Sequence, residues 1–254
     1  MGIYALTGSA SGIGAELATK LIAEGHSLIT VDIKDADIIA DLTTPDGRQA
    51  AVEAILSKAP DGLDGFIPLA GLGGGSAPDI LITKLNYFGT VELLMGVRGA
   101  LAKKSGAVVL LCSNSSPMIE PDEAFFEALL AVDEPAALKR AEEIDAGTHY
   151  MQTKRALNYW MRTNAMAYGR DGIRINGIAP GPTLTPMTRP LFESKEYGPI
   201  MESLLDATPI RRAAEAEEIA SCIMFLLSPA SSYVHGCLLW ADGGYDANTR
   251  QHHI

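Results

Sequence analysis

The sequence has few cysteines and few basic residues. Its three cysteines are an odd, widely spaced set that gives no disulfide framework, zinc knuckle or CxxC redox pair. It has 20 Lys and Arg against 31 Asp and Glu, a formal net charge of −11, so it lacks the concentrated basic face that nucleic-acid binding needs. We therefore expect small buried thiols in a reducing compartment and no nucleic acid as partner.

Long apolar runs and targeting segments are also missing. No run of 18 or more apolar residues is present, so we expect no membrane span. The first residues, MGIYALTG, lack a basic region and a cleavage site, and Leu6 stands where myristoylation requires Ser or Thr. We find no candidate metal site and no repeat or linker. The expectation is one cytoplasmic domain over residues 1–254.

Segments typical of strands and of helices alternate along the chain. The predicted strands are 3–7, 27–32, 65–71, 107–113, 173–181 and 237–244. The predicted helices are 13–22, 46–58, 80–102, 150–168 and 215–227. Nearly continuous apolar strands that alternate with helices indicate a parallel sheet covered on both faces. The fold class is therefore α/β with a doubly wound parallel sheet, the Rossmann fold.

A glycine-rich turn, TGSASGIG at residues 7–14, joins the first strand to the first helix. Gly8 permits the sharp turn, Gly12 lets a diphosphate approach the backbone, and Gly14 lets the helix pack closely on the strand. The free N–H groups at the helix start attract phosphate. We therefore expect a dinucleotide to be bound by Gly8, Ser11, Gly12 and Ile13.

Asp32, at the end of the second strand, indicates which dinucleotide is bound. A carboxylate there accepts hydrogen bonds from the adenosine ribose hydroxyls and repels a 2′-phosphate. No Arg or Lys lies within residues 9–13, and Lys34 is the only cation near Asp32. These features favour NAD(H) over NADP(H). Asp41, followed by Leu42, is a second candidate for the adenosine end, although a solvated surface Asp remains an alternative for it.

Several motifs in the same order resemble the short-chain dehydrogenase/reductase family. TGSASGIG resembles its TGxxxGxG, and Tyr150-Met-Gln-Thr-Lys154 resembles its YxxxK. Ser113 matches its catalytic Ser and Asn86 its helix Asn, while PGPTLT (180–185) and ADGG (241–244) match later motifs. Within the family, the ADLTTPDGR stretch at 40–48, KLNYFG at 84–89 and the long gap before Tyr150 are most similar to the bacterial 3α-hydroxysteroid dehydrogenase/carbonyl reductases. One departure is Leu69-Ala70-Gly71, where the family has Asn-Ala-Gly.

The candidate catalytic residues suit hydride transfer between a nicotinamide and a carbonyl, which leaves an alkoxide that needs a proton. Tyr150 is the acid, and Lys154, four residues on along the same helix face, stabilises its phenolate. Ser113 bonds the substrate oxygen, with Ser115 and Ser116 as competitors for that role. The resemblance implies that Lys154 also grips the nicotinamide ribose and that Asn86 holds a water that relays protons from Lys154. Taken alone, each could be an ordinary surface, strand-end or cap residue.

Further contacts are expected around the nicotinamide and the substrate. Ala70 and Gly71 let the cofactor pass close to the backbone, and Thr185 bonds the carboxamide. The resemblance adds Pro180, Gly181 and Thr183 on the cofactor side. On the substrate side we expect Ser115, Pro182 and Met187.

Two segments favour a bulky, largely apolar substrate. The insertion at 117–149 has an apolar stripe (Phe125, Phe126, Leu129 and Leu130) that predicts a helical pair, either packed on the body or contacting the substrate. It holds nine acidic and two basic residues, which suggests an acidic lid beside the active site. The second segment, 186–212, carries Met187, Leu191, Phe192 and Met201 and is expected to act as a lid as well.

These features predict an NAD-dependent oxidoreductase acting on a secondary alcohol or ketone such as a 3α-hydroxysteroid. Aryl or terpene alcohols are the alternative substrates. A non-catalytic NAD-binding regulator is the alternative function, although such proteins usually lose the acid or its Lys. A sugar epimerase would need a larger C-terminal region than the ten residues after Gly244. Helices 80–102 and 150–168 could pair across a two-fold axis, so a homodimer or homotetramer is expected.

Overall fold

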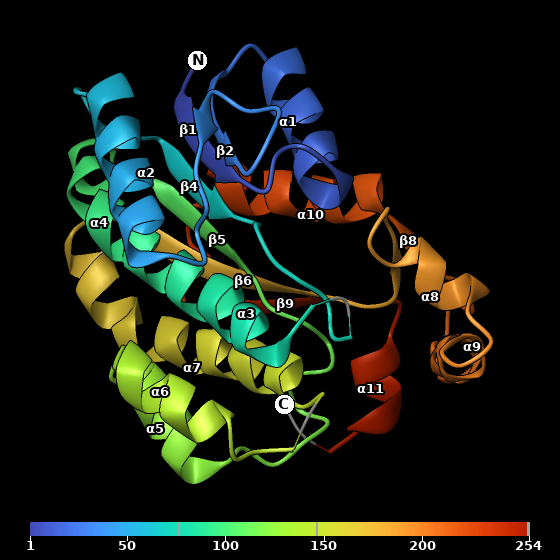
Figure 1. The fold of residues 1–254 in the computed structure, drawn as a ribbon. Helices are drawn as coiled ribbons and strands as arrows, with labels where there is room; N and C mark the ends of the chain where they lie inside the picture. The colour runs from blue at the N-terminus through green and yellow to red at the C-terminus, as the bar shows by residue number, and fades with distance from the viewer. Residues whose placement is uncertain (76, 146, 253–254) are drawn as a thin grey trace.

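The structure of the chain, a computed structural model, describes residues 1–75, 77–145 and 147–252. Seven strands form a parallel sheet in the order β3-β2-β1-β4-β5-β6-β9 (Figure 1). They are β1 (Ile3–Thr7), β2 (Ser27–Asp32), β3 (Ile38–Ile39), β4 (Gly65–Pro68), β5 (Ala107–Leu111), β6 (Arg174–Pro180) and β9 (Leu238–Ala241). The order reverses between β1 and β4, and sheets of this kind bind ligands beyond the carboxyl ends of the strands at that point. The predicted fold class is confirmed.

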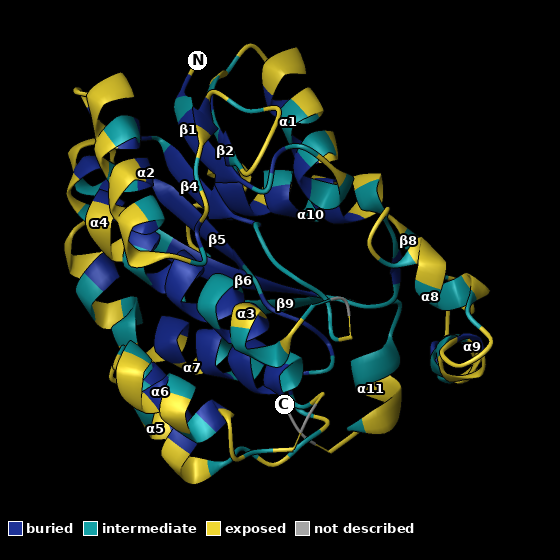
Figure 2. Ribbon diagram, in the orientation of Figure 1, coloured by how far each residue is buried: buried dark blue, intermediate teal, exposed yellow. Residues whose placement is uncertain are grey.

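Helices cover both faces of the sheet. One face carries α1 (Gly12–Ala23) and α10 (Ala216–Leu227), and the other carries α2 (Pro45–Lys58), α4 (Gly89–Lys104) and α7 (His149–Arg170). Successive strand side chains point to opposite faces, so in β1 Leu6 joins the α1–α10 core while Ala5 joins the other. Figure 2 shows the sheet as a buried layer between helices with exposed outer faces.

The predicted helix 80–102 is one helical stretch with a wider turn inside it. α3 (Asp79–Thr83) runs into a π-helical turn, η1 (Lys84–Phe88), which continues into α4. Such turns occur mostly as insertions in α-helices at functional sites, and this one carries Asn86. The stretch Asp79–Lys104 is apolar and long enough to cross a membrane, but its most apolar window is 61% buried inside the protein. That burial is what a core helix shows.

Several boundaries differ from those predicted. β4 ends at Pro68 instead of 71, and β5 at Leu111 instead of 113, so Ser113 stands in the turn after the strand. The two-residue strands β3, β7 (Thr183–Leu184) and β8 (Ala214–Glu215) were not predicted, because two residues carry no periodicity. The short helices η2 (Pro229–Ser231) and α11 (Tyr245–Thr249) were also missed.

The insertion at 117–149 forms the predicted helical pair, with Ala146 outside the described residues. Its helices are α5 (Glu123–Leu130) and α6 (Glu134–Ala141), and their N-terminal turns are capped by Asp122 and Asp133. The apolar stripe faces the protein: Phe125, Phe126 and Leu129 are buried in the core. The Phe126 ring meets the Tyr159 ring of α7 edge-on, at a centroid distance of 5.1 Å.

The segment 186–212 is built differently. It forms α8 (Arg189–Glu193) and α9 (Gly198–Ala207), and within these two fully described helices only Gly198 is buried. Figure 1 shows both standing away from the body of the fold, on the opposite side from α5 and α6. Apart from the exposed Ile200, the large apolar side chains of these two helices are therefore only partly buried.

Candidate active site

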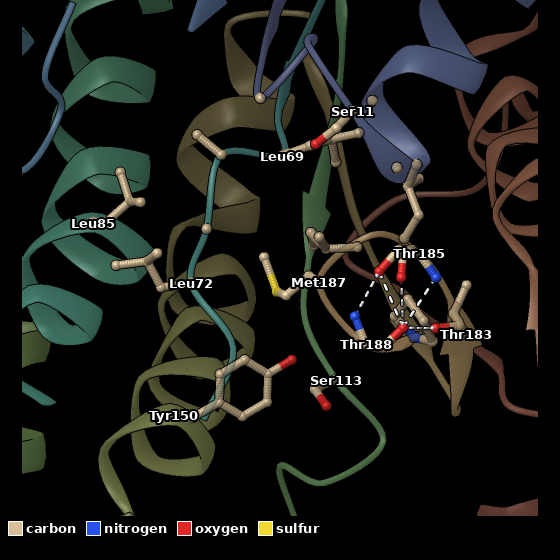
Figure 3. A pocket seen from close by; sticks show the side chains of 18 of the residues that line it. Ser11, Leu69, Leu72, Leu85, Ser113, Tyr150, Thr183, Thr185, Met187 and Thr188 are labelled. Carbon is tan, nitrogen blue, oxygen red and sulfur yellow. Dashed lines mark hydrogen bonds between the residues drawn. The ribbon is translucent and has the colours of Figure 1, made fainter. Parts of the chain in front are cut away.

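A cavity of about 680 Å³ lies beyond the carboxyl ends of the central strands. Its volume falls within the range of small-molecule sites. Every predicted site residue except Asn86 lines it. Figure 3 shows Tyr150 and Ser113 at one end, Leu72 and Leu85 on one wall, and the segment from Thr183 to Thr188 opposite. The structure therefore brings residues from widely separated parts of the chain to one site.

The glycine-rich turn forms one end of the cavity. Gly8 has a φ of +71°, and a β-carbon there would lie 2.6 Å from the Ala70 nitrogen. A β-carbon on Gly14 would lie 1.9 Å from the Gly8 oxygen. The Ser11 side chain does not cap α1, and no acidic residue stands in its first turn. The helix start therefore keeps donors that a phosphate can take.

Two carboxylates, Asp32 and Asp41, line the cavity. Asp32 Oδ2 accepts from the Ala10 nitrogen at 3.0 Å, and Oδ1 accepts from the Ile33 nitrogen at 2.7 Å, so Asp32 ties the end of β2 to the glycine-rich turn. Among the described lining residues Lys154 is the only base, and it stands at the other end. Near Asp32 and Asp41 the described lining residues therefore include carboxylates and no Lys or Arg.

Tyr150 and Ser113 form the reacting end. Tyr150 lies in the first turn of α7, and Ser113 follows β5. The Ser113 and Ser115 hydroxyls share a hydrogen bond of 2.9 Å, and the Ser115 nitrogen donates to Ser113 Oγ at 3.2 Å. Burial raises the pKa of Tyr150, and the hydrogen bond with Ser113 opposes that rise. The phenol is thus protonated at neutral pH and placed beside a hydroxyl.

Lys154 lies one helical turn after Tyr150. Its Nζ donates to the Leu111 oxygen at 2.7 Å and stands 5.9 Å from the centre of the Tyr150 ring. Burial lowers the pKa of Lys154 to about 8. Burial is the largest influence on the pKa of Tyr150 and raises it, so the expected stabilisation of the phenolate by Lys154 stays a prediction.

Asn86 does not line the cavity. Its side chain is fully buried, where Oδ1 accepts from the Leu72 nitrogen at 2.8 Å and Nδ2 donates to the Leu72 oxygen at 2.9 Å. Both ends of the amide therefore hold the loop that follows β4. The expected water relay from Lys154 stays a prediction, and the amide's visible task is to fix Leu72, which does line the cavity.

The segment after β6 is held by its own hydroxyl groups. Thr183 Oγ1 donates to the Gly181 oxygen at 2.9 Å, and the hydroxyls of Thr185 and Thr188 share a bond of 3.1 Å (Figure 3). Thr188 also bonds the Thr183 oxygen. A β-carbon on Gly12 would lie 3.4 Å from Thr185. These bonds set the shape of the wall that faces the glycine-rich turn.

The two expected lids have different outcomes. Within the described part of the insertion, 117–145 and 147–149, no residue lines the cavity, so its expected place as a lid is wrong. Its apolar stripe is buried against α7 and the neighbouring core. The segment 186–212 does reach the cavity, through Met187, Met201 and Leu204. Leu191 and Phe192, also expected in that lid, do not line it.

Some lining residues were missed from the sequence. Leu72, Leu81 and Leu85 form an apolar wall, and the spacing of the last two is one helical turn. Asn114 lies beside Ser113, is 8% exposed, and its Nδ2 has no hydrogen-bond partner. It is the only described lining residue with such an unpaired buried atom. An unpaired buried amide is costly, so this end of the cavity suits a ligand with polar groups. In the described ranges no group of three or more His, Cys, Asp or Glu could hold a metal ion.

Comparisons with known proteins agree with this arrangement. A family model described as enoyl-(acyl carrier protein) reductase matches residues 8–246. The chain is 38% identical to a 3α-hydroxysteroid dehydrogenase/carbonyl reductase of Comamonas testosteroni, over 98% of both chains. It is 30% identical to a coniferyl-alcohol dehydrogenase of Pseudomonas sp., over 94% of both chains.

Solved structures give the same picture. The crystal structure of a 3α-hydroxysteroid dehydrogenase from Pseudomonas sp. B-0831, complexed with NADH, is 38% identical and superposes with a TM-score of 0.93 over 99% of this chain and 100% of that chain. The motifs, the cavity and these matches lead to one conclusion: this chain belongs to the short-chain dehydrogenase/reductase family.

Proposed function

We propose that the chain is an NAD(H)-dependent oxidoreductase that interconverts a bulky, largely apolar secondary alcohol and its ketone, such as a hydroxysteroid. The observation that carries the proposal is the grouping of Ser113, Tyr150 and Lys154 at one end of a cavity whose outer walls are apolar. The glycine-rich turn and Asp32 occupy the other end of the same cavity. One site thus offers both a nucleotide cradle and an acid–base group.

The residues present fit NAD(H). Gly8, Ser11, Gly12 and Ile13 would hold the diphosphate, and Asp32, Asp41 and Leu42 the adenosine. The nicotinamide half would lie along Ala70, Gly71, Pro180, Gly181, Thr183 and Thr185, with Tyr150 and Lys154 beside its ribose. The relative from Pseudomonas sp. B-0831 was solved with NADH. Such a cofactor supplies the hydride in reduction and accepts it in oxidation.

The chain's own residues handle the proton. In reduction, the substrate oxygen gains negative charge, and Ser113 donates a hydrogen bond to it while Tyr150 gives up its phenolic proton. The raised pKa of Tyr150 keeps that proton available at neutral pH. Lys154 places a positive charge near the phenolate that remains. Reversal of the same steps serves the oxidation of an alcohol.

The apolar walls favour a bulky neutral substrate. Leu72, Leu81, Leu85, Met187 and Met201 all line the cavity, and desolvation of such apolar surfaces drives the binding of apolar ligands. A relative at 38% identity is a hydroxysteroid dehydrogenase. Another, at 30%, is a coniferyl-alcohol dehydrogenase, which keeps aryl alcohols as the second substrate class.

The test compares Tyr150→Phe with Tyr159→Phe, an exposed tyrosine on the same helix. With NAD and a panel of steroid, terpene, aryl and short sugar alcohols, Tyr150→Phe should lower turnover by about 10²- to 10⁴-fold, the usual contribution of acid–base catalysis. NADH affinity, measured by fluorescence titration, should stay within about threefold. Full turnover in Tyr150→Phe would favour a non-catalytic NAD-binding regulator. Activity confined to short sugar alcohols would contradict the proposed class of bulky, largely apolar substrates.

Three further expectations remain part of this proposal. Residues 1–254 act as one catalytic domain, the chain works in the cytoplasm, and it forms a homodimer or homotetramer. For assembly through α7, the structure adds one restriction: Trp160 and Met161 are buried in the core, and Phe126 of the insertion covers part of Tyr159. Met166 remains exposed. Light scattering of the purified protein measures the oligomeric state directly.

A further inference from the structure

Arg48 is a buried cation outside the cavity. It lies on α2, and its side chain is 2% exposed. Its Nε donates to Glu92 Oε2 at 2.7 Å and one terminal nitrogen donates to Glu92 Oε1 at 3.3 Å, which makes a forked pair with α4. A buried guanidinium requires such partners, because desolvation without them costs several kcal/mol. Two partners besides Glu92 complete its surroundings.

The second partner comes from the insertion. Arg48 bonds Glu134, the first residue of α6, whose side chain is 14% exposed. Most of the nine acidic residues of the insertion are exposed to solvent, whereas the Glu134 side chain is largely buried against the rest of the protein. It is the point where the added helices are tied by charge to the nucleotide-binding half of the fold.

The third partner is the cavity wall. The other terminal nitrogen of Arg48 donates to the Leu42 oxygen at 3.4 Å. The N–H of the same peptide, on Thr43, donates to Asp41 Oδ1 at 2.9 Å. Because a peptide is planar, holding its oxygen sets the direction of its N–H. That N–H, together with the Thr43 hydroxyl at 2.7 Å, holds the Asp41 carboxylate. Asp41, Leu42 and Thr43 all line the cavity.

The segment is also tightly packed. A β-carbon on Gly47 would lie 2.0 Å from the Asp41 oxygen, and one on Gly89 would lie 3.3 Å from the Leu42 oxygen. α2 and α4 therefore approach this strip of backbone closely from two sides. A change in the position of Arg48 would be passed on to Asp41 and Leu42 instead of being absorbed by free space.

We propose that the insertion serves cofactor binding: Glu134 positions Arg48, and Arg48 positions the Asp41–Leu42 wall that receives the adenosine end of NAD(H). Glu134 and Arg48 are positioning residues, since neither lines the cavity. The inference rests on the proposed function. It assigns the insertion a role at the end of the site opposite to the substrate, which its sequence did not suggest.

The test replaces Glu134 by Gln, which keeps the size and removes the charge. The matched control is Glu123→Gln, because Glu123 is the first residue of α5 and is exposed. NADH affinity is measured by fluorescence titration without substrate, alongside KM for a ketone at saturating NADH. Glu134→Gln should weaken NADH about threefold to tenfold, the range of couplings carried by such networks. The control and the KM should change less than twofold.

Arg48→Lys is the second variant, since it keeps the charge but loses the forked contacts. It should weaken NADH to a similar extent, and combining it with Glu134→Gln should add little. Unchanged NADH affinity with a lowered melting temperature would overturn the inference and leave the insertion as packing alone. A raised ketone KM with normal NADH affinity would also overturn it. Failure of the wild type itself to bind NADH would count against the proposed function instead.

Discussion

The two added helical pairs, α5–α6 and α8–α9, look alike in sequence and differ in what their apolar side chains contact. Both carry apolar residues at helical spacing and both follow a segment of the active site. In α5 the side chains of Phe125, Phe126 and Leu129 are buried in the core. In α9, Met201 and Leu204 line the cavity and remain only partly buried.

This difference separates packing from recognition. The apolar stripe of α5 packs against other side chains of the protein, so the free energy gained by removing it from water stabilises the fold. The apolar side chains Met201 and Leu204 of α9 stay partly exposed at the cavity, so covering them can contribute to the binding of an apolar ligand. Amphipathic spacing alone predicts that a helix buries one face. It does not tell whether the buried face meets protein or substrate.

The largest expected effect is on stability, in the insertion. Phe125→Ala removes a fully buried ring and should lower the free energy of unfolding by about 3–5 kcal/mol, measured by urea denaturation. Glu127→Ala, an exposed position on α5, should stay within about 0.5 kcal/mol. The ketone KM of folded Phe125→Ala should change less than about twofold. A large rise in KM without loss of stability would mean that the insertion does contact substrate.

The same comparison explains what the sequence could predict. The glycine-rich turn and the Tyr150–Lys154 pair depend on local spacing, so the sequence located both. The partners of Arg48 lie 44 and 86 residues away in Glu92 and Glu134, and no local pattern reveals such pairs. The π-helical turn at Lys84–Phe88 also has no signature in spacing. The sequence predicted the class of strand order, a doubly wound parallel sheet. It did not predict where α5 and α6 pack on the protein, because that depends on contacts between distant residues.

Lys154, which lines the cavity, is a buried side chain that carries a charge. In the described part of the chain it forms no ion pair with a carboxylate. Burial lowers its pKa to about 8, from about 10.4 in an unfolded chain. Below pH 8 both states are protonated and the full cost of burying the charge is present. Between these two values only the unfolded state holds the proton, so stability rises with pH.

The rise of stability with pH should depend on the Lys154 side chain. Relative to Lys154→Met, the wild type should gain about 3 kcal/mol of unfolding free energy between pH 7 and pH 10.5. Urea denaturation of both proteins across that range measures the difference, and groups common to both cancel. Parallel curves would show that the charge of Lys154 is already compensated within the protein. The charge of Lys154 would then be offset by other groups of the protein, just as the apolar side chains of α5 are covered by their neighbours.

The smallest expected effect tests α9 itself. Met201→Ala and Leu204→Ala should each lower kcat/KM for a bulky ketone about tenfold, because truncating an apolar contact in a pocket costs about 1–3 kcal/mol of transition-state binding. A small ketone such as cyclohexanone should lose less than about twofold, since it leaves that wall untouched. Stability should stay within about 1 kcal/mol, because neither side chain is packed in the core.

Ile200→Ala is the matched control for α9, since Ile200 is 53% exposed and does not line the cavity. It should leave both substrates unaffected. The dependence on substrate size is the decisive readout, because general damage to the fold would slow both ketones equally. If Met201→Ala instead destabilises the protein as Phe125→Ala does and leaves the bulky ketone unchanged, α9 is a second packing element. The recognition surface would then reduce to Leu72, Leu81, Leu85 and Met187, which α9 does not carry.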